Sequence, residues 1–210
     1  MTLSDTLWRD NADLAQEALR HPFVGGLADG TLPAERFAGF IAQDAFFLES
    51  FARAYALALA QSPDRAGVEA FADLLAGVRE ELRLHGSYAQ RLGIDLAAVE
   101  PASATVAYTD FLLATAAIGG TGATCAAMTP CMRLYAYLGR TLAAAPHGEA
   151  YAEWIQTYAA PEFDELAGTL ERLLDRYSGD ADRERGTYRR AMRLEVDFFD
   201  SAYRGVSVGS

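Results

Sequence analysis

The sequence lacks features that mark several classes of protein. It contains no lysine, so its 18 basic residues are all arginine, and its formal net charge is −11. An acidic chain without a basic cluster argues against a nucleic-acid partner. No uncharged apolar run reaches the length of about 18 residues that a membrane span needs. The opening "MTLSDTLWRD" has neither the basic start nor the apolar stretch of a signal peptide. We therefore expect a cytoplasmic protein without nucleic-acid or membrane partners.

Cysteine is also scarce. The chain has two cysteines, which are too few for a disulfide scaffold. A bond between Cys125 and Cys131 is not expected, because positions six apart on helix-like backbone point to different faces. Neither cysteine is therefore assigned to a disulfide.

Metal-ligating and phosphate-binding motifs are incomplete. The only histidines are His21, His85 and His147, and the first and last are predicted to lie in loops. Glu81 and His85 stand one turn apart and could form half of a di-iron carboxylate site, but no histidine follows position 147 to complete it. Neither a Gly-rich phosphate loop nor a G-x-S-x-G motif is present. We expect no metal and no cofactor.

Apolar residues at helical spacing dominate what is present. They make up 51% of the 210 residues, enough for one sizeable core. Ser4 is a plausible cap for the first helix, Pro33 suits the start of the second, and "HPFVGGLADGTL" (21–32) is predicted to be a loop. The predicted helices cover 4–20, a segment from about 33, 66–92, 103–118, 130–144, 148–177 and 181–203.

The predicted fold class is all-α. We expect a single-domain helical bundle over residues 1–210, with about seven helices and a flexible tail at 203–210. Several helices are apolar on more than one side. Either one helix is fully buried or subunits pack together.

The stretch "MTPCMRLY" (128–135) contains a candidate nucleophile. If Thr129 caps a helix that Pro130 opens, Cys131 lies in the first turn, where unpaired N–H groups and the helix dipole stabilise a thiolate. The alternative is a small buried residue, because free cysteine is among the most buried residue types. Cys125 has no comparable feature and is interpreted as a core residue.

Two carboxylates occur among aromatic residues. Asp44, in "FIAQDAFFLESF", is either a partly exposed edge residue or an acid that binds an N–H group of a ligand. Glu195, in "MRLEVDFF", is followed by Phe198 one turn on. Burial there would raise its pKa and suit it to donate a proton; the alternatives are exposure or an ion pair with Arg190 or Arg193.

Five tyrosines lie in otherwise apolar helical segments. They are Tyr108, Tyr135, Tyr137, Tyr151 and Tyr158. Buried tyrosines are commonly core residues with a satisfied hydroxyl, but a cluster of them can also hold a flat heteroaromatic ring. Both interpretations stay open at this point.

Five dispersed motifs resemble the TenA family (thiaminase II or aminopyrimidine aminohydrolase) over nearly the whole chain. They are "HPFVGGLADGTLPAERFAGFIAQDAFFL", "YTDFL", "MTPCMRLYAYLG", "YAEWIQTYAAPEF" and "LEVDFFDSAY". They occur in the family's order and at its usual spacing. The "PC" pair is similar to that of the branch with a catalytic cysteine.

This resemblance implies a fold, an assembly and a reaction. The fold would be haem-oxygenase-like without haem, and the assembly a homo-oligomer, commonly a tetramer. The reaction would be the hydrolysis of 4-amino-5-aminomethyl-2-methylpyrimidine, and perhaps thiamin, to hydroxymethylpyrimidine in thiamin salvage. The small-molecule partner is thus an aminopyrimidine or thiamin.

The resemblance also implies roles for individual residues. Cys131 would be the nucleophile and Glu195 the acid/base at a ring nitrogen. Asp44 would bind the pyrimidine's amino group. The remaining pocket residues would orient or stack on the substrate, and they are Phe47, Tyr108, Tyr135, Tyr158 and Phe198. The family often has tyrosine where this chain has Phe47, so a hydroxyl is lost there and the substrate preference is open.

Two other functions are compatible with the sequence. One is a di-iron oxygenase on the same type of fold, which the missing histidine disfavours. The other is a non-catalytic pyrimidine-binding or regulatory protein.

Overall fold

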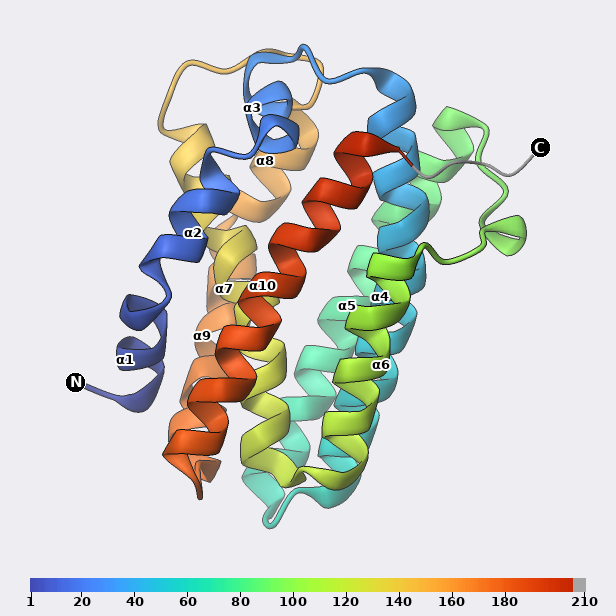
Figure 1. The fold of residues 1–210 in the computed structure, drawn as a ribbon. Helices are drawn as coiled ribbons and strands as arrows, with labels where there is room; N and C mark the ends of the chain where they lie inside the picture. Colours follow the sequence, from blue (N-terminus) through green and yellow to red (C-terminus); the bar gives the residue numbers. More distant parts are fainter. Residues whose placement is uncertain (206–210) are drawn as a thin grey trace.

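Long helices lie alongside one another along the molecule's long axis, with shorter helices at one end and one side (Figure 1). The computed structural model describes residues 1–205, which contain ten α-helices, one short 3₁₀ helix and no strand. The helices are α1 (Leu3–Asp10), α2 (Ala12–Leu19), α3 (Pro22–Asp29), α4 (Ala34–Gln61), α5 (Arg65–Leu92), η1 (Leu96–Ala98), α6 (Ser103–Ile118), α7 (Gly120–Ala143), α8 (Ala152–Ala159), α9 (Pro161–Tyr177) and α10 (Ala181–Arg204).

The all-α prediction is confirmed, but the number of helices was underestimated. The predicted helix 4–20 is two helices that meet at Asn11, and the cap of α1 is Thr2 rather than Ser4. Ser4 is buried and donates to Asp175 through its hydroxyl, at 2.8 Å. The predicted helix 148–177 is likewise interrupted, at Ala160 before Pro161, because the residue before a proline avoids helical geometry.

The segment predicted as a loop at 21–32 is largely helix. Residues Pro22–Asp29 form α3, in which Pro22 occupies the first turn and the His21 side chain accepts from the Phe23 N–H at 3.1 Å. The glycines there did not prevent a helix, because Phe23 and Leu27 are fully buried and fix the segment by packing. Gly30, with φ of 78°, ends it.

The predicted helix start at Pro130 is wrong. Helix α7 begins ten residues earlier, at Gly120, and Pro130 lies inside it. An internal proline removes a backbone hydrogen bond, which is tolerated here because Pro130 and its neighbours are buried between other helices. The Thr129 hydroxyl bonds back to the Cys125 carbonyl at 2.7 Å instead of capping a helix. Cys131 is therefore in mid-helix, away from the dipole at the N-terminus.

Helix α7 is central to the bundle. It packs against α6, α8, α9 and α10, and most of its residues are buried. Gly139 permits a close approach to α8, since a Cβ at this position would lie 2.4 Å from the Tyr158 carbonyl carbon. The backbone of α8 is thus held directly against α7, one turn beyond Tyr135.

The first and last parts of the chain pack against each other. Helix α10 contacts α1, α2, α3, α4, α6 and α7. Helix α10 ends at Arg204, and residues 206–210 of the predicted tail lie outside the described residues. Among the described helices, none has the length and apolar character needed to cross a membrane.

Candidate active site

Five helices bring the predicted site residues to the interior of the bundle, and a sixth helix adds two further residues. Asp44 and Phe47 come from α4, Tyr108 from α6, Cys131 and Tyr135 from α7, Tyr158 from α8, and Glu195 and Phe198 from α10, while α5 adds Glu81 and His85. Residues spread over about 150 positions of sequence therefore meet at one place, as the ring contacts and hydrogen bonds below show.

Cys131 is a free, partly exposed thiol beside buried residues. The α7 residues from Gly122 to Pro130 are all buried, whereas part of the Cys131 surface is not covered by protein. Burial raises the pKa of the Cys131 thiol well above its usual value, and the charges of Glu195, Glu81 and Asp44 raise it further. The resting group is a neutral thiol, which needs a base to become a nucleophile.

Glu195 is the nearest such base. Its side chain is 2% exposed and accepts a hydrogen bond from the Tyr108 hydroxyl at 2.6 Å. Burial raises the pKa of Glu195 to about 8, against the smaller opposing effect of the Tyr108 hydrogen bond. Neither predicted arginine partner is used, and Arg190 instead covers the Phe111 ring at 4.7 Å. At neutral pH the Glu195 carboxyl group holds a proton.

Asp44 and His85 form the charged part of the site. Asp44 is 4% exposed, which rules out the alternative of a partly exposed edge position, and its Oδ2 lies 2.7 Å from His85 Nε2. Burial lowers the pKa of His85, but the hydrogen bond and charge of Asp44, with the charge of Glu81, outweigh it and raise the pKa to about 9. His85 is thus a cation at neutral pH, and its Nδ1 lies 2.9 Å from the Glu81 carbonyl oxygen.

Glu81 lies beside this pair. Its carboxylate accepts from the Tyr158 hydroxyl at 2.7 Å. Burial, followed by the nearby charge of Asp44, raises the pKa of Glu81 to about 7. Glu81 and His85 were considered in the sequence only as half of a metal site. The signal that could have found them is Asp44 itself, because an aspartate on an aromatic helix face needs a donor.

Aromatic rings pack beside these polar groups. The Phe47 ring centroid lies 4.8 Å from that of Tyr108, which bonds to Glu195, and 5.9 Å from that of Phe198. Tyr135 contacts Tyr158, which bonds to Glu81, at 4.9 Å between centroids. Aromatic rings of this kind suit the binding of a flat, largely apolar ring.

Other candidates lie elsewhere. Tyr137 accepts from Gln16 and packs edge-on against Trp8, and Tyr151 donates to the Leu32 carbonyl at 2.6 Å. These two tyrosines serve packing. Cys125 is fully buried, and burial raises the pKa of its thiol far above the ordinary value, so it does not form a thiolate at neutral pH.

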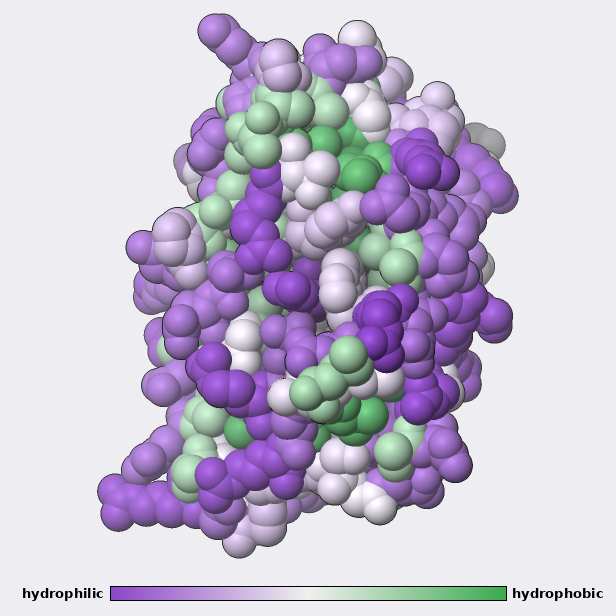
Figure 2. Space-filling view, turned by 90° about the vertical axis from the view of Figure 1, so that its left-hand side faces the viewer, coloured by the Kyte–Doolittle hydropathy of each residue, from purple (hydrophilic) through white to green (hydrophobic). Residues whose placement is uncertain are grey.

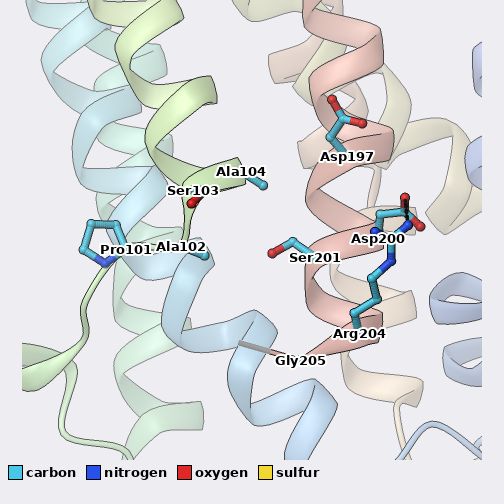
Figure 3. Close-up of a pocket in the computed structure, with 9 residues that line it drawn as sticks. All are labelled: Pro101, Ala102, Ser103, Ala104, Asp197, Asp200, Ser201, Arg204 and Gly205. Carbon is cyan, nitrogen blue, oxygen red and sulfur yellow. Dashed lines mark hydrogen bonds and ion pairs between the residues drawn. The ribbon is translucent and has the colours of Figure 1, made fainter. Parts of the chain in front are cut away.

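Neither a metal cluster nor the surface hollow beside the end of α10 adds to the site. Within residues 1–205, no group of three or more His, Cys, Asp or Glu side chains is arranged to hold a metal ion. A hollow of about 550 Å³ between the start of α6 and the end of α10 is lined by Asp197, Asp200 and Arg204 (Figure 3). Its arginine is paired with Asp200 at 2.8 Å, and it includes none of the predicted site residues.

The chain is similar to known proteins over nearly its whole length. The sequence profile of the TENA/THI-4/PQQC family matches residues 8–205. An aminopyrimidine aminohydrolase of Halalkalibacterium halodurans is 35% identical over 97% of this chain and 96% of its own length. A TenA family transcription regulator from a Silicibacter species has a TM-score of 0.91 at 28% identity, covering 97% of both chains.

A more distant structure identifies the fold. A domain of unknown function from Shewanella denitrificans, with a heme oxygenase-like fold, has a TM-score of 0.76 at 13% identity. It covers 95% of this chain and 91% of its own. The predicted haem-oxygenase-like fold is confirmed.

Proposed function

Because the chain belongs to the TENA/THI-4/PQQC family, we propose that it is a hydrolase of carbon–nitrogen bonds, an aminopyrimidine aminohydrolase or thiaminase II. Its substrate is 4-amino-5-aminomethyl-2-methylpyrimidine, or thiamin, and its product is hydroxymethylpyrimidine for thiamin salvage. The observation that carries this proposal is the placement of a thiol and a protonated carboxyl group on an aromatic-walled site.

The aromatic walls and Asp44 bind the substrate in this proposal. The pyrimidine ring lies between the Phe47–Phe198 side and the Tyr135–Tyr158 side. One oxygen of Asp44 is held by His85, and the other accepts the amino group of the pyrimidine. His85 supplies the partner at 2.7 Å that a carboxyl group in a buried position needs.

Glu195 and Cys131 carry out the first chemical step. Protonated Glu195 donates its proton to a ring nitrogen, which makes the ring a better electrophile. The resulting carboxylate then takes the proton of the Cys131 thiol, and the sulfur adds to a ring carbon. The proton lost by sulfur thus replaces the one given to the ring. Tyr108, bonded to Glu195 Oε1, holds the carboxyl group in place for both transfers.

Expulsion of the amine and hydration complete the cycle. The exocyclic amine of the aminomethylpyrimidine is an ammonium group at neutral pH. Electrons from the ring form a double bond to the exocyclic carbon, and the carbon–nitrogen bond breaks with its electron pair on nitrogen, which leaves as ammonia. Water adds its oxygen to that carbon and gives its proton to the released ammonia. The sulfur–carbon bond then breaks, the ring nitrogen returns its proton to Glu195, and Glu195 returns one to the sulfur, so that the aromatic ring and the thiol are restored. No metal or cofactor enters this sequence.

The location, assembly and domain organisation belong to the same proposal. We propose a cytoplasmic homotetramer in which residues 1–210 form one domain, without a nucleic-acid or membrane partner. Contacts of α10 with both the first and the central helices support a single folded unit.

The test of this function is an assay of ammonia release, with separation of the pyrimidine product. The purified protein is incubated with the aminomethylpyrimidine and with thiamin, and we expect hydroxymethylpyrimidine from one or both. A protein that binds these compounds without turnover would instead be the pyrimidine-binding regulator. Iron-dependent oxidation would identify the di-iron alternative.

A further inference from the structure

A second cavity lies beside the candidate active site. It has a volume of about 310 Å³, within the range of ligand pockets in proteins, and it is formed by α4, α5, α7, α8, α9 and the α8–α9 junction. We name it the α5–α9 cavity. It is lined by Tyr55, Leu74, Gly77, Val78, Glu80, Glu81, Leu84, Met132, Thr157, Ala160, Glu162, Phe163 and Leu166.

The cavity is lined mainly by apolar residues, and its charged lining residues are all acidic. Most of the lining side chains are aliphatic or aromatic, and the charged ones are Glu80, Glu81 and Glu162. None of these described lining residues is an arginine. An apolar space with carboxylates and no cation favours a positively charged ligand with apolar surface. The molecular face seen in Figure 2 is mainly hydrophilic, with hydrophobic residues showing in recesses between the polar ones.

Two polar groups of the cavity are available to a ligand. The Tyr55 hydroxyl is buried and has no hydrogen-bond partner among the described residues. Glu81 has one oxygen bonded to Tyr158 and is not ion-paired with an arginine, since the 15 ion pairs of the described residues leave it out. A raised pKa of Glu81, to about 7, is the sign of a carboxylate whose charge lacks compensation.

Glu81 also belongs to the candidate active site. Its hydrogen-bond partner Tyr158 packs against Tyr135, and its charge acts on the Cys131 thiol. Met132, the residue after Cys131, lines the cavity as well. The cavity and the reacting centre therefore have Glu81 in common and lie next to each other.

We propose that the α5–α9 cavity binds the leaving-group side of the substrate and that Glu81 is the positioning residue for its positive charge. The substrate class is an aminopyrimidine whose exocyclic carbon is bonded to the cationic nitrogen of an apolar group, of which the thiazolium of thiamin is the example. The thiazolium nitrogen takes the electron pair of the broken bond and leaves as a neutral thiazole. This inference rests on the proposed function for its substrate and on the cavity for its location.

A pair of glycine substitutions in α5 tests the inference. Gly77 lines the cavity, and a Cβ there would meet only the flexible end of the Leu166 side chain, at 2.8 Å. In G77L the new side chain fills the cavity. Gly86 lies in the same helix, with nothing within 4 Å of an added Cβ, so G86L is the matched control. G77L should raise KM for thiamin about tenfold more than KM for the aminomethylpyrimidine, which corresponds to a lost contact of ordinary strength. G86L should leave both values at wild type.

A charge substitution supplies the second variant. Glu81→Gln keeps an acceptor for the Tyr158 hydroxyl but removes the negative charge. It should therefore also raise KM for thiamin more than KM for the aminomethylpyrimidine. Glu69→Gln is its control in the same helix, because exposed Glu69 pairs with Arg65 and does not line the cavity. Equal effects of G77L on both substrates, or no effect on thiamin in either G77L or Glu81→Gln, would overturn the inference.

A binding measurement separates this inference from the proposed function. The probe is the 3,4-dimethylthiazolium cation, observed by saturation-transfer NMR with the intact protein. Binding that is lost in G77L and kept in G86L supports the cavity even if no pyrimidine is turned over. Absence of binding to wild type, or binding that G77L leaves unchanged, contradicts it whatever the enzyme assay shows.

Discussion

The candidate site contains two pairs of buried polar residues, Asp44 with His85 and Cys131 with Glu195, and the two pairs differ in charge. Asp44 and His85 form an ion pair at 2.7 Å, with each charge matched by the other. No ion pair within residues 1–205 involves Cys131 or Glu195, and burial raises the pKa of each so that both stay protonated. Aromatic rings pack beside both groups.

This difference separates binding from proton transfer. A matched ion pair gains nothing by exchanging its proton, so the Asp44–His85 group offers a fixed acceptor to a substrate. A carboxyl group with a pKa of about 8 can give and take a proton near neutral pH at small cost. We therefore expect substitutions in the two groups to affect different kinetic constants.

Among the three polar partners Glu195, Asp44 and His85, the largest effect is expected for Glu195→Gln. The amide still accepts from Tyr108 but cannot donate a proton to the ring or accept one from the thiol. We expect kcat to fall by about a hundredfold or more, the usual contribution of general acid–base catalysis. Steady-state kinetics with circular dichroism as the folding check would measure this. A wild-type kcat in the variant would remove Glu195 from proton transfer.

The dependence of kcat/KM on pH also tests proton transfer by Glu195. Because Glu195 must be protonated to act on the ring, kcat/KM of the wild type should fall above pH 8, near the pKa of about 8. This limb should be absent in Glu195→Gln. Retention of the limb in that variant would assign it to another group.

A smaller effect, on KM, is expected for His85→Gln. Without the imidazolium, Asp44 loses its partner and becomes a poorer acceptor for the substrate amino group. KM should rise about tenfold, the loss expected for one charge-assisted hydrogen bond, with kcat less affected. His147→Gln is the matched control, because His147 lies in the loop before α8 and touches no site residue in the contacts described above. A fall in kcat alone would contradict a positioning role.

The smallest effect is on stability. The folded-state pKa of Glu195, about 8, lies above its ordinary value of 4.5, so the folded protein binds more protons than the unfolded chain between these pH values. This contribution is complete below pH 4.5 and is lost as the pH rises through 8. Glu195→Gln should therefore be more stable than wild type at pH 8, by at least about 1 kcal/mol, but not at pH 4.5.

Urea unfolding at the two pH values would measure this difference. Glu165→Gln, at a well-exposed position on α9, is the control and should follow the wild-type curve. An equal gain for Glu195→Gln at both pH values would show that the effect is not linked to protonation.

The sequence was sufficient for the fold class and for most helices, because helical periodicity reports burial directly. It failed where tertiary contacts outweigh local preference. Proline is common at the start of a helix, yet Pro130 lies inside α7, where its neighbours are buried. Cys131 is therefore not at a helix N-terminus, and it is a neutral thiol rather than the thiolate expected there. The glycines of 21–32 mark a loop locally, but Phe23 and Leu27 make α3 part of the core.

The site was partly predictable for the same reason. Resemblance indicated Asp44, Cys131 and Glu195, but not the pairing of Asp44 with His85, since their 41-residue separation leaves no local pattern. The chemistry of the carboxylate could have suggested a donor, though not which one. The role of Glu81 required the α5–α9 cavity, a feature of packing that no sequence motif encodes.

The most direct test of the central claim, that Cys131 is the nucleophile, compares turnover in Cys131→Ala and Cys125→Ala. Both remove one thiol from α7, but only Cys131 is partly exposed beside Glu195. We expect Cys131→Ala to lose about a thousandfold or more in kcat, as for other nucleophiles, while Cys125→Ala keeps it. Wild-type turnover in Cys131→Ala would contradict the account.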